Sequence, residues 1–137
     1  MTTATTTQNH PHTLRTVRAW SGTSRARTAA VWTLSVAAAA MFLMAGWGKL
    51  SGAPQMVGLY DAIGVGQWFR YLTGAIEVTS ALALFVPSVA AFAAAALAAT
   101  MVGAVATHLF IVGGSVAIPV VLLVATSFIA WTRWSQR

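Results

Sequence analysis

Four long apolar segments, separated by short turns or by a more polar loop, follow residue 28 of the chain. A helix of about 17–25 residues, rising ~1.5 Å per residue, is long enough to cross the ~30 Å hydrocarbon core of a membrane. Proline and glycine mark the ends of two of these segments, at Pro87 and at Gly113-Gly114. The pattern therefore predicts four membrane-spanning helices, at about residues 29–48, 68–86, 88–112 and 116–132.

The remaining segments are more polar. Residues 1–28 are rich in Thr, Ser and Arg, which predicts a disordered cytoplasmic tail, and residues 133–137 form a basic C-terminal tail. Residues 50–66 predict a loop, with a short amphipathic helix at Gln55–Ile63 that lies along the membrane surface. The expected fold is all-α: a single four-transmembrane-helix bundle at residues 29–132.

The composition supports a membrane location. Of the 137 residues, 58% are hydrophobic and 7% are charged, against ~25% charged residues in soluble domains. The net charge of +6 comes largely from arginines that precede the first span or follow the last. Because Lys and Arg stay on the cytoplasmic side, we expect an N-in/C-in, multi-pass protein of the cell (inner or plasma) membrane. Its expected partner is the lipid bilayer and no nucleic acid.

Glu77 is the main candidate for chemistry, because it is the only charged residue between Arg70 and Arg133. An ionisable group within a membrane span is costly and marks a candidate functional site. In the four-span topology, Lys49 at the end of the first span and His108 near the end of the third lie in the same half of the bilayer as Glu77. We therefore expect Glu77 to face the bundle interior and to pair with Lys49, His108 or both, as a candidate catalytic cluster.

Structural explanations for the same residues stay open at this point. Lys49 is also placed to anchor its helix at the interface. His108 could hydrogen-bond a backbone carbonyl or a lipid headgroup, and Glu77 could hydrogen-bond a neighbouring helix without taking part in chemistry. Arg70 is expected to reach the membrane interface, and Tyr60 to join the interfacial aromatic belt.

Several cofactor classes are excluded by the residues present. The chain has no cysteine, which excludes thiolate metal sites, cysteine-ligated iron–sulfur clusters and thiol redox chemistry within it. His10 and His12 in the tail are not expected to bind a metal. His108 is the only histidine within the spans, so a bis-histidine haem within one chain lacks its second ligand, and a haem shared between two subunits stays open. We expect no metal and no resident cofactor, with a quinone as the candidate ligand.

Three motifs, in order along the chain, resemble the DoxX-like family. They are the G-x-x-K-L segment Gly46–Leu50, the G-x-x-E segment that begins at Gly74 and continues through Ser80-Ala81-Leu82, and a third-span pattern that ends in Thr107-His108-Leu109. The resemblance covers roughly residues 30–132. It implies a four-helix integral membrane protein and a link to small membrane subunits associated with quinol oxidase and thiosulfate:quinone oxidoreductase activity.

Three functions fit these observations. In the first, a membrane subunit supports quinone-linked electron transfer, with Glu77, His108 and Lys49 binding a quinone carbonyl or passing protons; a membrane-associated redox enzyme would supply the electrons. If the chain is part of an enzyme, that enzyme is a quinone-linked oxidoreductase. In the second, a non-enzymatic module recruits or assembles another protein, and the polar cluster only fixes helix packing. In the third, the protein is a small proton-coupled transporter.

Overall fold

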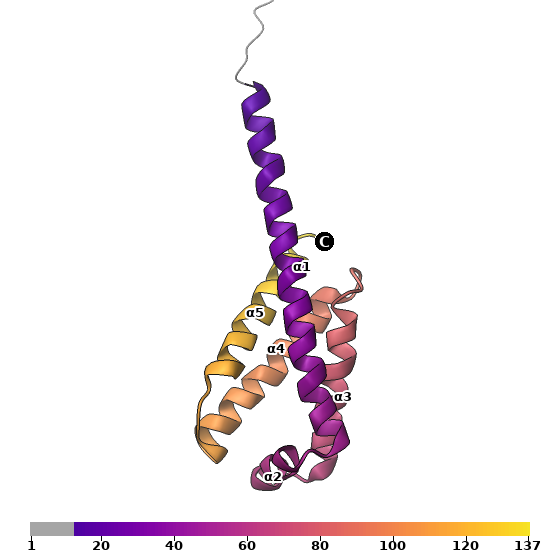
Figure 1. The fold of residues 1–137 in the computed structure, drawn as a ribbon, viewed down its shortest axis with the longest axis vertical. Coiled ribbons are helices and arrows are strands. Elements are labelled where there is room, and N and C mark those ends of the chain that lie inside the picture. The colour runs from indigo at the N-terminus through magenta and orange to yellow at the C-terminus, as the bar shows by residue number, and fades with distance from the viewer. Residues whose placement is uncertain (1–12) are drawn as a thin grey trace, which may run out of the picture. The chain divides into compact units, whose positions relative to one another are not determined.

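The computed structural model describes the backbone of residues 13–137 and the side chains of residues 24–137, and every regular element in this part of the chain is helical. Residues Val31–Arg137 form one compact unit, and the helical residues before Val31 belong to another. The elements are α1 (Thr13–Ser51), α2 (Pro54–Ile63), α3 (Gln67–Ala83), α4 (Ala90–Thr107), the π-helix η1 (His108–Val112) and α5 (Ala117–Trp134). Figure 1 labels the five α-helices. The expected all-α class is confirmed.

The structure differs from the sequence-based expectation at the N-terminal end of α1. This helix begins at Thr13, so residues 13–28 are helical where a disordered tail was expected. No proline lies between Pro11 and Pro54, and the segment contains good helix formers such as Leu, Arg and Ala. Residues 1–12 lie outside the described residues, and so do His10 and His12, for which no metal binding was expected.

Three helices are long and apolar enough to cross a membrane: Ser24–Ser51 within α1, Ala90–Val112 across α4 and η1, and Ala117–Trp134 in α5. They correspond to the first, third and fourth predicted spans. The helix at the second predicted span, α3, has 17 residues and includes Arg70 and Glu77. A short helix, α2, is present where one was expected at Gln55–Ile63; it begins at Pro54, a residue suited to the first turn of a helix.

The core of the Val31–Arg137 unit combines a few large apolar side chains with many alanines. The fully buried side chains of Phe42, Leu84, Leu97 and Ile129 come from α1, the end of α3, α4 and α5, and buried alanines surround them. Alanine and glycine let helix backbones approach closely, which favours association where the surrounding lipid is as apolar as the side chains. The helices α4 and α5 pack side by side (Figure 1). Helix α4 also packs on α3, and α2 lies against α3 and η1.

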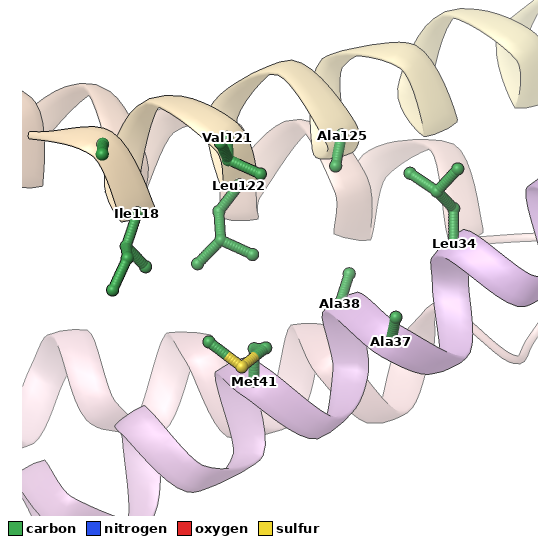
Figure 2. Close-up of a pocket in the computed structure, with 9 residues that line it drawn as sticks. Leu34, Ala37, Ala38, Met41, Ile118, Val121, Leu122 and Ala125 are labelled. Atoms are coloured by element: carbon green, nitrogen blue, oxygen red, sulfur yellow. The ribbon is translucent and has the colours of Figure 1, made fainter.

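The outer surface of this unit is largely apolar, with Trp47 70% and Phe110 84% exposed. A groove of about 440 Å³ between α1 and α5 belongs to this surface (Figure 2). Only aliphatic residues line it: Leu34, Ala37, Ala38, Met41, Ala117, Ile118, Val121, Leu122 and Ala125. Such a surface suits contact with lipid chains, and the groove offers no polar group for chemistry.

Candidate functional site

The site is built on a close crossing of α1 and α3 at two glycines. A methyl group added to Gly46 would lie 2.7 Å from Val78 Cγ2 and 3.1 Å from the Gly74 carbonyl oxygen. A methyl group added to Gly74 would lie 3.0 Å from Lys49 Cβ and 3.2 Å from the Gly46 carbonyl oxygen. Each glycine therefore makes room for the backbone of the other helix, and larger residues at these positions would push the helices apart.

This crossing directs Lys49 and Glu77 toward each other. Each lies three residues after a crossing glycine, Lys49 after Gly46 and Glu77 after Gly74. The two helices are antiparallel, since Gly46 meets Val78 whereas Leu50 meets Gly74. Side chains on a helix lean toward its N-terminus, so both side chains lean back toward the crossing and meet there.

The result is a buried ion pair within the apolar bundle. Lys49 Nζ donates to Glu77 Oε1 at 2.5 Å and to Oε2 at 2.6 Å. The Glu77 residue is 1% exposed, as expected for a carboxylate that faces the interior. The structure thus contains the predicted contact between these two residues; a catalytic role for either stays a prediction.

Arg70 fixes the backbone that carries Lys49. Its guanidinium donates to the Lys49 carbonyl oxygen and, through Nε, to Gln67 Oε1 at 2.6 Å. Gln67 Nε2 in turn donates to Asp61 Oδ1 at 2.7 Å and to the Val57 carbonyl at 3.0 Å. Arg70 is 4% exposed, so its side chain is packed against the end of α1 and does not extend freely from the helix surface. A cation at this place donates to a carbonyl at the C-terminal end of α1 and interacts favourably with the negative end of the helix dipole.

A cavity of about 430 Å³ lies beside the ion pair. Its wall is mainly apolar and comes from α2, α3, α4 and η1, with Lys49 contributed by α1. Small residues of α4, among them Ala96, Ala99 and Gly103, leave the space open, and a methyl group added to Gly103 would meet nothing within 4 Å. The polar residues in the lining are Lys49, Tyr60, Thr73, Glu77, Thr100, Thr107 and His108.

Tyr60, expected in an interfacial aromatic belt, lies in the wall of this cavity. Its hydroxyl lies 2.5 Å from Thr73 Oγ1, and its ring packs edge-on against Phe69 at 5.9 Å. Burial raises the pKa of the Tyr60 hydroxyl, so the group remains protonated at neutral pH. The sequence alone does not reveal this residue, because one tyrosine in a short helix gives no sign of which face meets a cavity.

His108 lines the same cavity from the junction of α4 and η1. Its Nδ1 lies 2.8 Å from the Ala104 carbonyl oxygen, which is the structural alternative anticipated from the sequence. No hydrogen bond joins its ring to Lys49 or Glu77 within the part of the chain that the structure describes. The structure therefore brings Lys49 and Glu77 into contact and places His108 elsewhere on the wall of the shared cavity.

The polar groups of the site can bind and orient a small ligand and can exchange protons with it. Residues 13–137 contain no cluster of three or more His, Cys, Asp or Glu side chains placed to hold a metal ion. The groups that the cavity does offer a ligand are hydrogen-bonding side chains and the Lys49–Glu77 charges.

The residues of this site fall within a segment that matches a known protein family. Neither the curated proteins nor the solved structures gave a match. A family model described as the DoxX-like family matches residues 33–129, which include the crossing glycines, the ion pair and His108. The match extends over more than half of the chain, in agreement with the resemblance in its motifs. The protein is a membrane protein that belongs to the DoxX-like family.

Proposed function

We propose that the chain is a four-span membrane subunit whose cavity binds the ring of a quinone and that it works with a membrane-associated redox enzyme. The observation that carries this proposal is the combination, in one cavity, of a mainly apolar wall with the buried Lys49–Glu77 pair. Small-molecule sites are typically cavities of about 300–1,000 Å³ with apolar walls and a few convergent polar groups, and the cavity beside Glu77 fits this description at about 430 Å³.

The four-span arrangement requires α3 to cross the bilayer beside α1. Its 17 residues rise about 25 Å, and hydrogen-bonded turns continue the chain as far as Val86. Its costly groups, Arg70 and Glu77, are buried against other helices and would not face lipid. Both arginine-containing ends of the chain then lie on the cytoplasmic side of the cell membrane, N-in and C-in.

Quinone chemistry couples electrons to protons, and the cavity supplies groups for the protons. Glu77 and His108 would exchange protons with the bound ring, and Lys49 would donate a hydrogen bond to a ring oxygen. The chain has no cysteine for an iron–sulfur cluster, so in this proposal the electrons come from the partner enzyme. Copurification in mild detergent with mass spectrometry of bound proteins and quinones identifies that partner.

Filling the cavity tests the proposal directly. A leucine at Gly103 would extend into the cavity without displacing protein atoms close to Cβ. The matched control is Ala95→Leu on the same helix, because Ala95 is exposed and does not line the cavity. In nanodiscs, a decyl-substituted benzoquinone should bind saturably to the unmodified protein and to the Ala95→Leu variant, and Gly103→Leu should lose at least about tenfold in affinity, or ~1.4 kcal/mol.

One observation favours a second candidate, a non-enzymatic assembly module. Lys49 and Glu77 neutralise each other's charge, as expected of a pair that only joins α1 to α3. That function predicts no saturable quinone binding, together with loss of stability in Glu77→Gln and a protein partner retained through copurification. Absence of saturable binding of both the quinone and its reduced form to the unmodified protein, or equal binding by both leucine variants, would refute the quinone proposal.

A further inference from the structure

The hydrogen-bonding groups of the cavity are unequally divided between donors and acceptors. Three of its threonines donate their only hydroxyl proton to a backbone carbonyl of their own helix: Thr73 to Phe69 at 3.0 Å, Thr100 to Leu97 at 2.7 Å and Thr107 to Gly103 at 2.9 Å. A hydroxyl has one proton and two lone pairs. Each threonine can therefore only accept a hydrogen bond from a ligand.

The hydroxyl proton of Tyr60 is donated to Thr73. Its hydroxyl lies 2.5 Å from Thr73 Oγ1, whose own proton is already donated to the backbone. Tyr60 is therefore the donor in this contact, and its oxygen keeps a lone pair. A ligand next to Tyr60 meets an acceptor.

His108 adds a further acceptor. A carbonyl oxygen only accepts hydrogen bonds, so the contact with Ala104 requires the proton on Nδ1. In the neutral ring, Nε2 then carries a lone pair and no proton. Thus the neutral imidazole offers a ligand an acceptor at Nε2 and no hydrogen-bond donor.

The ion pair contributes acceptors and only one donor. Lys49 Nζ has three protons, and its contacts with Glu77 Oε1 and Oε2 engage two of them. The Glu77 carboxylate can accept about four hydrogen bonds, and Lys49 is its only hydrogen-bond partner among the described residues. Lys49 therefore has one N–H left for a ligand, whereas the Glu77 oxygens retain free lone pairs.

From this imbalance we propose that the cavity is selective for a ring that carries hydroxyl groups, a hydroquinone or a related phenol, over the corresponding quinone. This inference rests on the proposed function and specifies the ligand further. A quinone only accepts hydrogen bonds and could use only the remaining N–H of Lys49. The two hydroxyls of a hydroquinone donate to acceptors such as Glu77 and His108 Nε2, and a hydroxyl oxygen can still accept from Lys49. Buried acceptors without a donor are costly, so the reduced ring is the better match.

The test compares three probes of similar shape on the full-length protein in nanodiscs: a decyl-substituted benzoquinone, its hydroquinone kept reduced under argon, and the dimethyl ether of that hydroquinone. The ether keeps the reduced ring and has no hydroxyl proton. We expect the hydroquinone to bind at least about tenfold more tightly than either of the others, because it gains hydrogen bonds that they cannot make.

A matched pair of variants locates the effect. Thr107→Val removes a hydroxyl that can accept a hydrogen bond in the cavity. Its control is Thr79→Val on the exposed side of α3, because the Thr79 hydroxyl also donates to the backbone carbonyl four residues earlier. Thr107→Val should weaken hydroquinone binding about fivefold and quinone binding less, and Thr79→Val should change neither.

The outcomes separate the two proposals. If the quinone binds as tightly as the hydroquinone, this inference is overturned and the proposed function still stands. The same holds if the dimethyl ether binds as tightly as the hydroquinone. If none of the three probes binds saturably, the proposed function fails and this inference fails with it.

Discussion

Replacing Glu77 by glutamine tests whether the charge pair holds α1 and α3 together. The Lys49 and Glu77 side chains are only 11% and 2% exposed, and their charged atoms are 2.5 Å apart. Glu77→Gln keeps the shape of the side chain but leaves the ammonium of Lys49 buried beside a neutral amide. Removing one partner of a buried ion pair typically costs about 3–5 kcal/mol. Because glutamine can still accept one hydrogen bond from Lys49, we expect about 3 kcal/mol, roughly a hundredfold change in the folded-to-unfolded ratio.

A double-mutant cycle isolates the interaction of the two residues. Lys49→Met leaves the carboxylate without its cation and should cost at least as much as Glu77→Gln. The double variant Lys49→Met/Glu77→Gln removes both charges and should be more stable than either single variant, because paired removal leaves no isolated buried charge. We expect a coupling free energy of at least about 2 kcal/mol, measured by unfolding in mixed detergent micelles and followed by tryptophan fluorescence.

The control for this cycle is Asp61→Asn. Asp61 is exposed, and it accepts a hydrogen bond from Gln67 through Oδ1, an interaction that asparagine can keep. Its cost should stay below about 1 kcal/mol. Additive effects of the Lys49 and Glu77 substitutions, or a cost of Glu77→Gln no larger than that of Asp61→Asn, would show that the pair does not hold the helices together.

Two other predictions concern the crossing and the cavity wall. Gly46→Ala should destabilise the protein by about 1–3 kcal/mol, because its methyl group would lie 2.7 Å from Val78 Cγ2. The control Gly48→Ala should be neutral or slightly stabilising in the same unfolding assay, because its methyl group would meet its nearest atom at 3.9 Å. Equal effects of the two substitutions would refute the close crossing at Gly46. The pKa of Tyr60 is raised above 10.0 by burial, so the folded state holds this proton longer than the unfolded state and stability should fall as pH rises above about 10. Tyr60→Phe should show a shallower fall in a titration of stability from pH 9 to 11, and an unchanged slope would contradict the assignment.

Glu77 could be identified from the sequence because a single charge in an apolar stretch has few explanations. Its contact with Lys49 could be anticipated because the predicted four-span topology puts both residues in the same half of the bilayer. The reason for their close contact was less evident: a glycine three residues before each of them lets the two helices touch. Spacing along one helix does not give the point at which another helix crosses it. The role of Gly46 and Gly74 in the crossing therefore becomes evident only in the structure.

Arg70 and Tyr60 illustrate the limit of sequence reasoning. Both residue types are common at membrane interfaces, and that preference does not reveal the helix contacts that bury them. Arg70 is buried because the last carbonyls of α1 need a donor, and Tyr60 is buried because α2 lies against the first turns of α3. Both causes are tertiary contacts between segments whose arrangement the sequence pattern leaves open.

The polarity of α3 bears on how the newly made protein enters the bilayer. Of the helices proposed to cross the membrane, α3 is the one whose length and composition do not by themselves favour insertion. A lone Lys or acidic residue at the centre of an inserting helix costs roughly 2.5–3.5 kcal/mol, and mutual neutralisation of Lys49 and Glu77 lowers that cost. We therefore expect α1 to remain at the insertion machinery until α3 has been synthesised, so that the two partition into lipid together as a preassembled pair.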